Sequence, residues 1–221
     1  MQKYPSQRAQ GDSLTFQQKQ RPIVAAFDFD GTLTRSDSLL PFLQFSSGVS
    51  KFTRYLLQLI PVLVQLFFGK IGNQAAKEAM LTRFFAGVDK TKITELGACF
   101  ADQKVPRLLR QKALARLHWH QQKGHYCVLV SASLDVYLEP WGTAMGFDAV
   151  ICSQLEFNSE NRITGRLVGA NCYGEEKVRR LRKLVGNPTV LYVYGDSRGD
   201  HELLKIADHA YYRYMPDSEE L

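Results

Sequence analysis

The sequence predicts an α/β protein: a doubly wound, Rossmann-like parallel sheet with an α-helical cap domain inserted after its first strand. Apolar runs of strand length at residues 23–27, 125–132 and 189–194 alternate with helical stretches, the pattern of a parallel sheet covered on both faces. Residues 36–104 show helical patterns and no strand pattern. Acidic or hydroxyl side chains follow the apolar runs, at the strand ends where such sheets bind ligands.

Length and charge are those of a globular protein with anionic partners. The 221 residues are enough for one domain, or for a domain with an insertion. An excess of 28 Lys and Arg over 22 Asp and Glu gives a net charge of +6, which favours phosphorylated metabolites, nucleic acid or an anionic membrane face. The densest basic cluster, from Lys177 to Lys183, has the spacing of one solvated helix face.

The cysteines and residues 1–21 indicate in which cellular compartment the protein is expected. The four cysteines lack Cys-x-x-Cys spacing and are predicted to be buried thiols in a reducing compartment: Cys99, Cys127, Cys152 and Cys172. Residues 1–21 are rich in Gln, Ser and Lys and contain no apolar segment suitable for a secretory signal. We therefore expect a flexible tail at residues 1–21 and a cytoplasmic protein.

The helical region after the first strand is expected to form the cap. Ser36 to Ser38, followed by apolar residues, has the form of a capped helix start. Two more helical stretches follow at residues 73–86 and 91–103. The chain returns to its first architecture at Pro106. These observations divide the chain into a tail, a cap of residues 36–104, and a core made of residues 22–35 and 105–221.

The stretch from Tyr55 to Phe68 is the most apolar part of the chain, with only a thin polar stripe of Arg54, Gln58 and Gln65. Its 14 residues are fewer than the roughly 20 needed to span a bilayer. Two interpretations remain open: burial within a helical bundle, or an interfacial helix against lipid, which would place the protein at the inner face of the membrane. Pro61 would either kink this helix or end one helix and begin the next.

Beyond the cap, strands and helices alternate. We expect helices at residues 107–123, 134–145 and 175–185, and strands at residues 125–132, 147–152 and 189–194. Residues 154–157 and 162–168 are expected to pair as a hairpin that turns through residues 158–161. A last helix and a short strand at residues 210–214 complete the core.

Two carboxylates follow the first strand. Side chains two apart on a strand point the same way, so Asp28 and Asp30 can converge on one small volume, and Gly31 lets the backbone turn away. Two carboxylates so near to each other repel unless one is protonated or a cation lies between them. A divalent cation such as Mg²⁺ suits this position. Taken alone, the same pattern also fits a strand that ends in a polar turn.

Four motifs stand in a fixed order along the chain. They are Asp28-Phe-Asp-Gly-Thr-Leu-Thr34, Ser131-Ala-Ser133, Lys177 within Gly174-Glu-Glu-Lys-Val178, and Gly195-Asp-Ser-Arg-Gly-Asp200. With these motifs the chain resembles the haloacid dehalogenase superfamily of phosphohydrolases, and most closely its phosphoserine-phosphatase-like branch, subfamily IB. The resemblance implies a Mg²⁺-dependent phosphomonoester hydrolase.

The resemblance also implies roles for the acidic residues. Asp28 would attack phosphorus to form an aspartyl-phosphate, which water then hydrolyses. Asp30 would protonate the departing oxygen and later deprotonate the water. Mg²⁺ would be held by Asp28, the backbone carbonyl of Asp30 and Asp196, with Asp200 either completing the metal site or lying just behind it.

Three further residues would contact the phosphoryl group. Ser131, at a strand end and followed by a helix, suits a hydroxyl and amide cradle with Ala132 for phosphate oxygens, although a serine there is also a common helix cap. Lys177 would balance the carboxylates and the transferring phosphoryl group.

The cap residues bear on the substrate. Phosphoserine phosphatases read the amino acid with a Glu and an Arg of the cap, and the corresponding positions here are Asp37 and Arg83. The shorter acid weakens the case for phosphoserine. The apolar stretch is similar to that of the bacterial phosphatidylglycerophosphate phosphatases in the same superfamily. A small phosphorylated metabolite and a lipid head-group phosphate both remain candidate substrates.

Two functions from other classes remain as alternatives. A phospho-acceptor signalling domain also uses Asp, Mg²⁺ and Lys on a doubly wound sheet, but it lacks an acid two residues after its phosphorylated Asp and lacks a cap. A catalytically silent protein could bind anionic membranes through the apolar cap. No nucleic-acid partner is expected, and the sequence specifies no oligomeric state.

Overall fold

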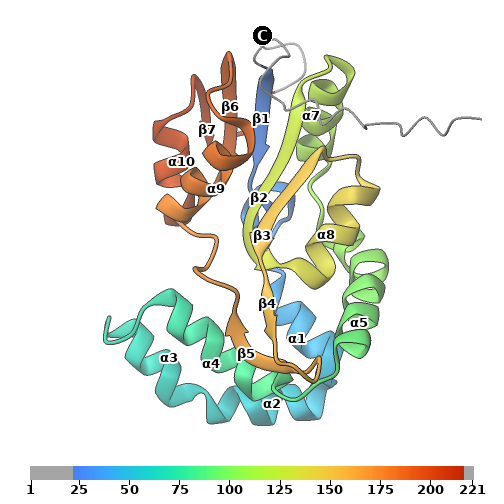
Figure 1. The fold of residues 1–221 in the computed structure, drawn as a ribbon, viewed down its shortest axis with the longest axis vertical. Helices are drawn as coiled ribbons and strands as arrows, with labels where there is room; N and C mark the ends of the chain where they lie inside the picture. Colours follow the sequence, from blue (N-terminus) through green and yellow to red (C-terminus); the bar gives the residue numbers. More distant parts are fainter. Residues whose placement is uncertain (1–21, 217–221) are drawn as a thin grey trace, which may run out of the picture.

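The computed structural model describes residues 22–216, and a five-stranded parallel sheet forms its centre (Figure 1). The strands lie in the order β3-β2-β1-β6-β7, so the first strand is central. Their bounds are β1 (Ile23–Phe27), β2 (Tyr126–Leu134), β3 (Ala149–Ser153), β6 (Val190–Gly195) and β7 (His209–Tyr212). The predicted parallel α/β fold is confirmed. The tail predicted at residues 1–21 lies outside the described residues.

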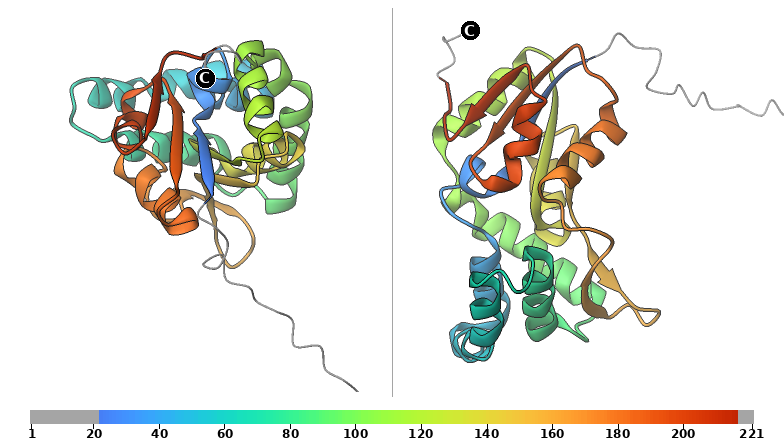
Figure 2. Two further views of the ribbon diagram at one scale, coloured as in Figure 1. Left: turned by 90° about the horizontal axis from the view of Figure 1, so that it is seen from above. Right: turned by 90° about the vertical axis from the view of Figure 1, so that its left-hand side faces the viewer.

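Helices cover both faces of this sheet (Figure 2). They are α7 (Gln111–Gln122) and α8 (Asp135–Ala144) on one face, and α9 (Glu175–Val185) and α10 (His201–Lys205) on the other. The central strand explains this arrangement. Its alternate residues Ala25 and Phe27 join one buried cluster and Val24 and Ala26 join a second, so an entirely apolar strand fills both sides.

Five helices lie beyond the carboxyl ends of the strands (Figure 1). They are α1 (Leu39–Ser47), α2 (Val49–Gln58), α3 (Ile60–Phe67), α4 (Asn73–Phe85) and α5 (Lys90–Gln103). The short α6 (Val105–Leu108) follows, with Pro106 in its first turn, so the helix predicted at residues 107–123 is two helices.

The predicted hairpin forms from β4 (Leu155–Phe157) and β5 (Ile163–Leu167). It extends from the sheet to the cap helices (Figure 2). The amide of Gly87 donates to the carbonyl of Ile163 at 2.8 Å, and the amide of Ile163 donates to the carbonyl of Val88 at 2.9 Å. The division of the chain into a cap of residues 36–104 and a core stays a prediction. The hairpin, which this division assigns to the core, forms backbone hydrogen bonds with residues of the predicted cap.

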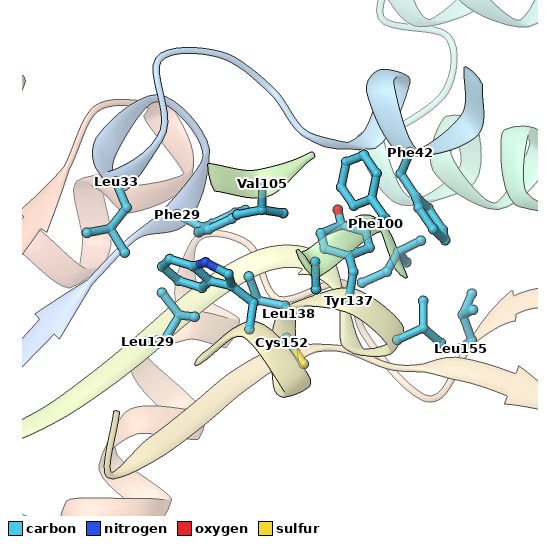
Figure 3. Close-up of a cluster of buried hydrophobic side chains, with 14 of the residues drawn as sticks. Phe29, Leu33, Phe42, Phe100, Val105, Leu129, Tyr137, Leu138, Cys152 and Leu155 are labelled. Carbon is cyan, nitrogen blue, oxygen red and sulfur yellow. The ribbon is translucent and has the colours of Figure 1, made fainter. Parts of the chain in front are cut away.

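Aromatic rings join the cap to the core (Figure 3). Phe42 of α1 and Phe100 of α5 lie 4.9 and 5.3 Å from the ring of Tyr137 on α8, and 5.2 Å from each other. All three side chains are fully buried. Three helices therefore share one apolar cluster directly beside the strand ends, which fixes where the cap can sit.

The apolar stretch is not buried inside the bundle. Pro61 is the second residue of α3, so it begins a helix and kinks none. Only Leu59, between α2 and α3, is buried, and five apolar side chains are exposed: Leu57, Ile60, Val64, Phe67 and Phe68. Hydropathy alone does not indicate which side of the apolar stretch packs against the rest of the protein. In the structure, α4 covers only one side of the pair formed by α2 and α3. No helix within residues 22–216 is long and apolar enough to cross a membrane.

Two other sequence expectations need correction. Cys127, Cys152 and Cys172 are buried free thiols as predicted, but Cys99 is exposed on α5. In the basic cluster on α9, Lys177 is buried instead of lying on a solvated face, because it belongs to the side of α9 that packs on the sheet.

Candidate active site

A sharp turn at the carboxyl end of β1 positions the first motif. Residues Phe29–Leu33 form one wide helical turn, η2, and Gly31 has a φ of +81°, a left-handed conformation that glycine adopts without strain. The amide of Asp28 donates to the carbonyl of Tyr194 on β6 at 2.9 Å. Asp28 is thereby placed at the boundary between β1 and β6, beside the loop that carries Asp196.

A buried lysine joins two of the predicted site residues. Nζ of Lys177 lies 2.6 Å from Oδ1 of Asp28 and 2.6 Å from Oδ1 of Asp200, and each of these side chains is at most 7% exposed. The second oxygen of Asp28 accepts a hydrogen bond from Oγ1 of Thr32 at 3.2 Å. Strand β1, helix α9 and the loop after β6 therefore meet at one ion-paired centre.

Burial and charge compete at this centre. Burial raises the pKa of Asp28 to about 7, even though Lys177 opposes the shift. Burial alone would lower the pKa of Lys177, but Asp28 and Asp200 outweigh it and raise that pKa well above the ordinary lysine value. Burial also tends to raise the pKa of Asp200. Lys177 outweighs this effect and holds the pKa of Asp200 below its usual range. One lysine leaves the negative charges incompletely balanced.

Asp28, Asp196 and Asp200 form a group of oxygens suited to a divalent cation. One carboxylate oxygen from each lies within 4.8 Å of the other two. Oδ1 of Asp196 is buried and has no hydrogen-bond partner among residues 22–216. Burial, together with Asp200, raises the pKa of Asp196. An orphaned carboxylate oxygen among neighbouring carboxylates fits Mg²⁺, which prefers oxygen ligands.

Asp200 is the most saturated of these acids. While Oδ1 accepts from Lys177, Oδ2 accepts from the backbone amides of Asp196 at 3.2 Å and Ser197 at 3.0 Å, and from the hydroxyl of Ser197 at 2.7 Å. These bonds hold the loop after β6 in shape. Asp200 therefore orients Lys177 and the neighbours of Asp196.

Asp30 has different partners from Asp28. Its carboxylate accepts from the amide of Ser38 at 2.8 Å and from the hydroxyl of Ser133. The hydroxyl of Ser38 in turn lies 3.0 Å from that of Tyr137. Burial, with a contribution from Asp37, raises the pKa of Asp30 to about 6. The two acids of the first motif thus occupy separate environments.

The second motif lies at the end of β2. The buried hydroxyl oxygen of Ser131 accepts from the amide of Ser133 at 3.1 Å, and the carbonyl of Ala132 accepts from Lys77 of the cap. Sequence reasoning passed over Ser133, although its place two residues after Ser131 put it on the same face of the strand.

The two substrate-reading residues predicted in the cap lie outside this hydrogen-bonded centre. Asp37 is exposed, and its carboxylate accepts from the amides of Leu39 at 2.9 Å and Leu40 at 3.2 Å, the contacts of a helix cap for α1. Arg83 is exposed on α4 and donates to Gln58, with its guanidinium 4.5 Å from the ring centre of Tyr55. The structure does not bring Arg83 to the site, because its face of α4 is turned toward α2.

Lys77, on another face of the same helix, extends to the end of β2. Its side chain is buried and donates to Ala132 and, at 3.2 Å, to Oδ1 of Asn171. Sequence reasoning missed Lys77 because a lysine within an amphipathic helix is ordinarily a surface residue.

Comparisons with known proteins agree with this arrangement. Residues 25–205 match the family model described as haloacid dehalogenase-like hydrolase. Protein CicA of Caulobacter vibrioides is 36% identical over 201 residues, which cover 90% of this chain and 90% of that protein.

Two solved structures share the fold. A protein with unknown function from Bordetella pertussis Tohama I superposes with a TM-score of 0.71 at 24% identity, over 85% of this chain and 87% of that one. A substrate-bound phosphoserine phosphatase superposes with a TM-score of 0.56 at 18% identity, over 86% and 84%. At these identities the two structures support the fold alone. The family match spans most of the chain and confirms the resemblance that the four motifs predict: this chain belongs to the haloacid dehalogenase-like hydrolase family.

Proposed function

We propose that this phosphatase of the haloacid dehalogenase family is a Mg²⁺-dependent phosphomonoesterase that works through an aspartyl-phosphate. The observation that carries the proposal is the separation of its two acids. Asp28 is held by Lys177 among carboxylates, whereas Asp30 is held by the two serines Ser38 and Ser133. This difference supports a role for Asp28 as the nucleophile and for Asp30 as the proton carrier.

Mg²⁺ fits the residues at the end of β1. Asp28, Asp196 and the backbone carbonyl of Asp30 would hold the ion, and Asp200 would act through Lys177 and the loop after β6. When bound, the ion offsets the repulsion between the carboxylates and the incoming phosphate. A cation held there would also favour the ionised form of Asp28, which burial otherwise disfavours.

The protein's own groups account for the two chemical steps. In the first, a carboxylate oxygen of Asp28 bonds to phosphorus while the bond to the leaving oxygen breaks, and Asp30 gives that oxygen a proton. In the second, Asp30 takes a proton from water, the water oxygen bonds to phosphorus, and the bond to Asp28 breaks to release phosphate. The raised pKa of Asp30, about 6, suits a group that must both donate and accept.

Ser131, Ala132 and Lys177 would bind the phosphoryl oxygens. The hydroxyl oxygen of Ser131 accepts from Ser133, and no group within residues 22–216 receives its proton. That proton is therefore available to an anionic oxygen beside the backbone amide of Ala132. Lys177 lies against the nucleophile and contributes a fixed positive charge.

For the substrate we propose a small phosphorylated metabolite, phosphoserine-like in size, or a lipid head-group phosphate. The lipid alternative rests on the exposed apolar side of α2 and α3, where Phe67 is 84% and Phe68 69% exposed. Exposed Lys51, Arg54 and Lys70 lie on the same segment and suit an anionic membrane face. We propose a cytoplasmic protein that can contact the inner face of the membrane through these helices.

Sedimentation with liposomes that contain anionic phospholipid tests this contact. Wild-type protein should pellet with the vesicles, and the Phe67→Ser/Phe68→Ser variant should remain in the supernatant. Equal partition of the two proteins would refute the contact without bearing on catalysis.

The catalytic proposal is tested by phosphate release from p-nitrophenyl phosphate. Wild type should release phosphate with Mg²⁺, lose activity on chelation and regain it when Mg²⁺ is restored. Asp28→Asn should show no release above background, while Asp102→Asn, at an exposed carboxylate of α5, should retain wild-type activity. Substantial activity in Asp28→Asn, or in chelated wild type, would overturn the mechanism. A stable phosphoprotein without turnover would instead indicate a phospho-acceptor domain.

A further inference from the structure

A cavity of about 590 Å³ lies beside the proposed metal site. Its walls come from the turn after β1, the start of α7, the loop after β6 and the segment after β7. Of the residues assigned to the catalytic centre, Asp196 lines this cavity. Asp28, Lys177 and Ser131 do not. The cavity therefore borders the catalytic centre at Asp196 but is a separate space.

Three cationic side chains line this cavity, from two segments that are far apart in the chain. Arg110 directly precedes α7, Lys112 is the second residue of α7, and Arg213 follows β7. Asp196 is the single acid in the part of the wall that residues 22–216 form. Because the cations outnumber this acid, the cavity favours an anionic ligand.

Both arginines are held in place through Nε. Nε of Arg110 donates to the carbonyl of Thr34 at 2.9 Å, and Nε of Arg213 donates to the carbonyl of Asp196 at 2.7 Å. Within residues 22–216, neither arginine forms an ion pair with a carboxylate, and their terminal nitrogens Nη1 and Nη2 have no hydrogen-bond partner. Each guanidinium thus keeps two NH₂ groups for a ligand, and their fork matches the oxygens of a phosphate.

The backbone also fixes the position of Arg213. Its φ is +56°, a left-handed conformation that residues other than glycine seldom adopt. The amide of Arg213 donates to the carbonyl of Gly195 at 2.8 Å, next to the bond from Nε to Asp196. Two hydrogen bonds to successive carbonyls therefore hold this residue in the wall. A side chain that is ordered before binding loses little entropy when a ligand arrives.

Other residues give the same cavity an apolar wall: Ala113, Tyr214 and Met215. Tyr214 is 53% exposed, and Met215 packs against the hydrophobic core. An aromatic ring beside two guanidiniums suits a ligand that joins a flat ring to phosphate, because nucleobases stack on tyrosine. The volume lies within the range of roughly 300–1,000 Å³ that is typical of sites for small organic ligands.

We propose that this cavity is a second anion-binding site, which takes a nucleoside diphosphate. The phosphates bind Arg110 and Arg213, and the base stacks on Tyr214. Two phosphates match two guanidiniums, since each guanidinium pairs with one phosphate. The proposed phosphomonoesterase reaction does not use this ligand, so binding is tested without turnover.

Isothermal titration calorimetry at low ionic strength measures the binding of ADP, pyrophosphate and adenosine to the full chain, with EDTA present to prevent hydrolysis. ADP should bind more tightly than pyrophosphate, which lacks the base, and than adenosine, which lacks the charge. Arg110→Met and Arg213→Met should each raise the Kd of ADP by roughly 10- to 100-fold, the equivalent of one charge-assisted hydrogen bond. Tyr214→Ala should raise the Kd of ADP by roughly 10-fold and leave that of pyrophosphate unchanged.

Two control variants locate the ligand. Ser131→Ala alters the proposed phosphoryl site and should leave the Kd of ADP unchanged. Arg182→Met removes an exposed arginine of α9, on the opposite face of the sheet, and should also leave it unchanged. Weaker binding in Ser131→Ala, with none of this loss in Arg110→Met or Arg213→Met, would place ADP in the catalytic centre and overturn the second site. Arg110→Met tests the proposal if Arg213→Met does not fold.

The outcomes distinguish this inference from the catalytic proposal. A wild type that binds no ADP at millimolar concentration refutes the second site. Equal affinity for ADP and pyrophosphate, unchanged in Tyr214→Ala, refutes the nucleotide and shows a site for phosphate groups alone. Neither result bears on phosphate release from p-nitrophenyl phosphate, which tests the catalytic proposal by itself.

Discussion

Gly31 and Asp196 are in such close contact that a β-carbon at position 31 would lie 2.1 Å from Oδ2 of Asp196. A side chain at position 31 would displace the carboxylate of Asp196, and Gly31 also has a φ of +81°. Glycine at this position therefore lets the turn after β1 approach the loop after β6 without moving Asp196. This contact brings the turn after β1 and Asp196 together at the proposed metal site.

We expect Gly31→Ala to impair catalysis more than folding. The added methyl group must displace Asp196, and a misplaced ligand costs on the order of 100-fold in kcat/KM. The half-saturating Mg²⁺ concentration should rise as well, which a Mg²⁺ titration of activity measures. Gly87→Ala is a matched control, because Gly87 has a φ of +79° and nothing within 4 Å of the added carbon. Equal losses of activity in both variants would show that backbone strain alone is responsible.

Lys177→Met should destabilise the fold and remove activity. It leaves Asp28 and Asp200 buried without their shared cation, a loss of about 3–5 kcal/mol in the free energy of unfolding for a broken buried pair. The double variant Lys177→Met/Asp200→Asn should recover part of that stability, because it removes one of the two unpaired charges. Urea denaturation without Mg²⁺ measures both. Strictly additive losses would contradict the coupling.

His120 should make the protein sensitive to mild acid. Burial, aided by Arg116 and His125, lowers its pKa from 6.5 to about 3, because the ring is enclosed next to Tyr194 and His125. As the pH falls below 6.5, the unfolded state binds a proton that the folded state excludes, so stability is lost toward pH 3 at up to about 1.4 kcal/mol per pH unit.

His120→Phe should reduce the slope of this acid limb between pH 6.5 and 5, as measured by urea midpoints at each pH. His118→Phe serves as the control because His118 lies on the exposed side of α7. An unchanged slope in His120→Phe would assign the acid sensitivity to other groups.

Arg116→Met should leave the protein at least as stable as wild type. The guanidinium is 1% exposed, and two of its nitrogens, Nη1 and Nη2, have no hydrogen-bond partner within residues 22–216. Its Nε donates to Tyr194 at 2.7 Å, and His120 can still pair with that hydroxyl after the change. Methionine can pack on the ring of Trp119, which lies 4.2 Å from the guanidinium carbon.

The expected gain is about 1–2 kcal/mol, since unpaired buried charge is costly and part of it is offset by contact with aromatic rings. Thermal and urea denaturation measure it. Arg107→Met, at an exposed arginine of α6, should change stability by less than about 0.5 kcal/mol. A clear loss in Arg116→Met would show that the guanidinium is stabilising where it lies.

The sequence was most informative about the core. Residues 175–185 are predicted as a helix and form one with these bounds, and the strands at the sheet centre shift by only a few residues. Helical and strand periodicity depend on neighbours in the chain, so they can be read locally. The positions of Asp28, Ser131 and Asp196 at strand ends follow from the same local signals.

The cap residues depended on tertiary structure. Lys77 and Arg83 are six residues apart on α4, and both are basic residues of one helix. Only the packing of α4 on β5 and on the segment after it turns Lys77 inward and leaves Arg83 beside Tyr55. The rotation of a helix about its axis is set by its neighbours, which the sequence of that helix does not contain.

The sequence by itself determined the order of strands and helices, the placement of two acids after β1, and the family to which the chain belongs. Only the tertiary structure decided which cation reaches the site from the cap, that Asp30 pairs with Ser133, and which side of the apolar stretch stays exposed. The physical reason is the range of the interactions. Local propensity forms each element, whereas the facing of side chains is fixed by contacts between segments that lie far apart in the chain.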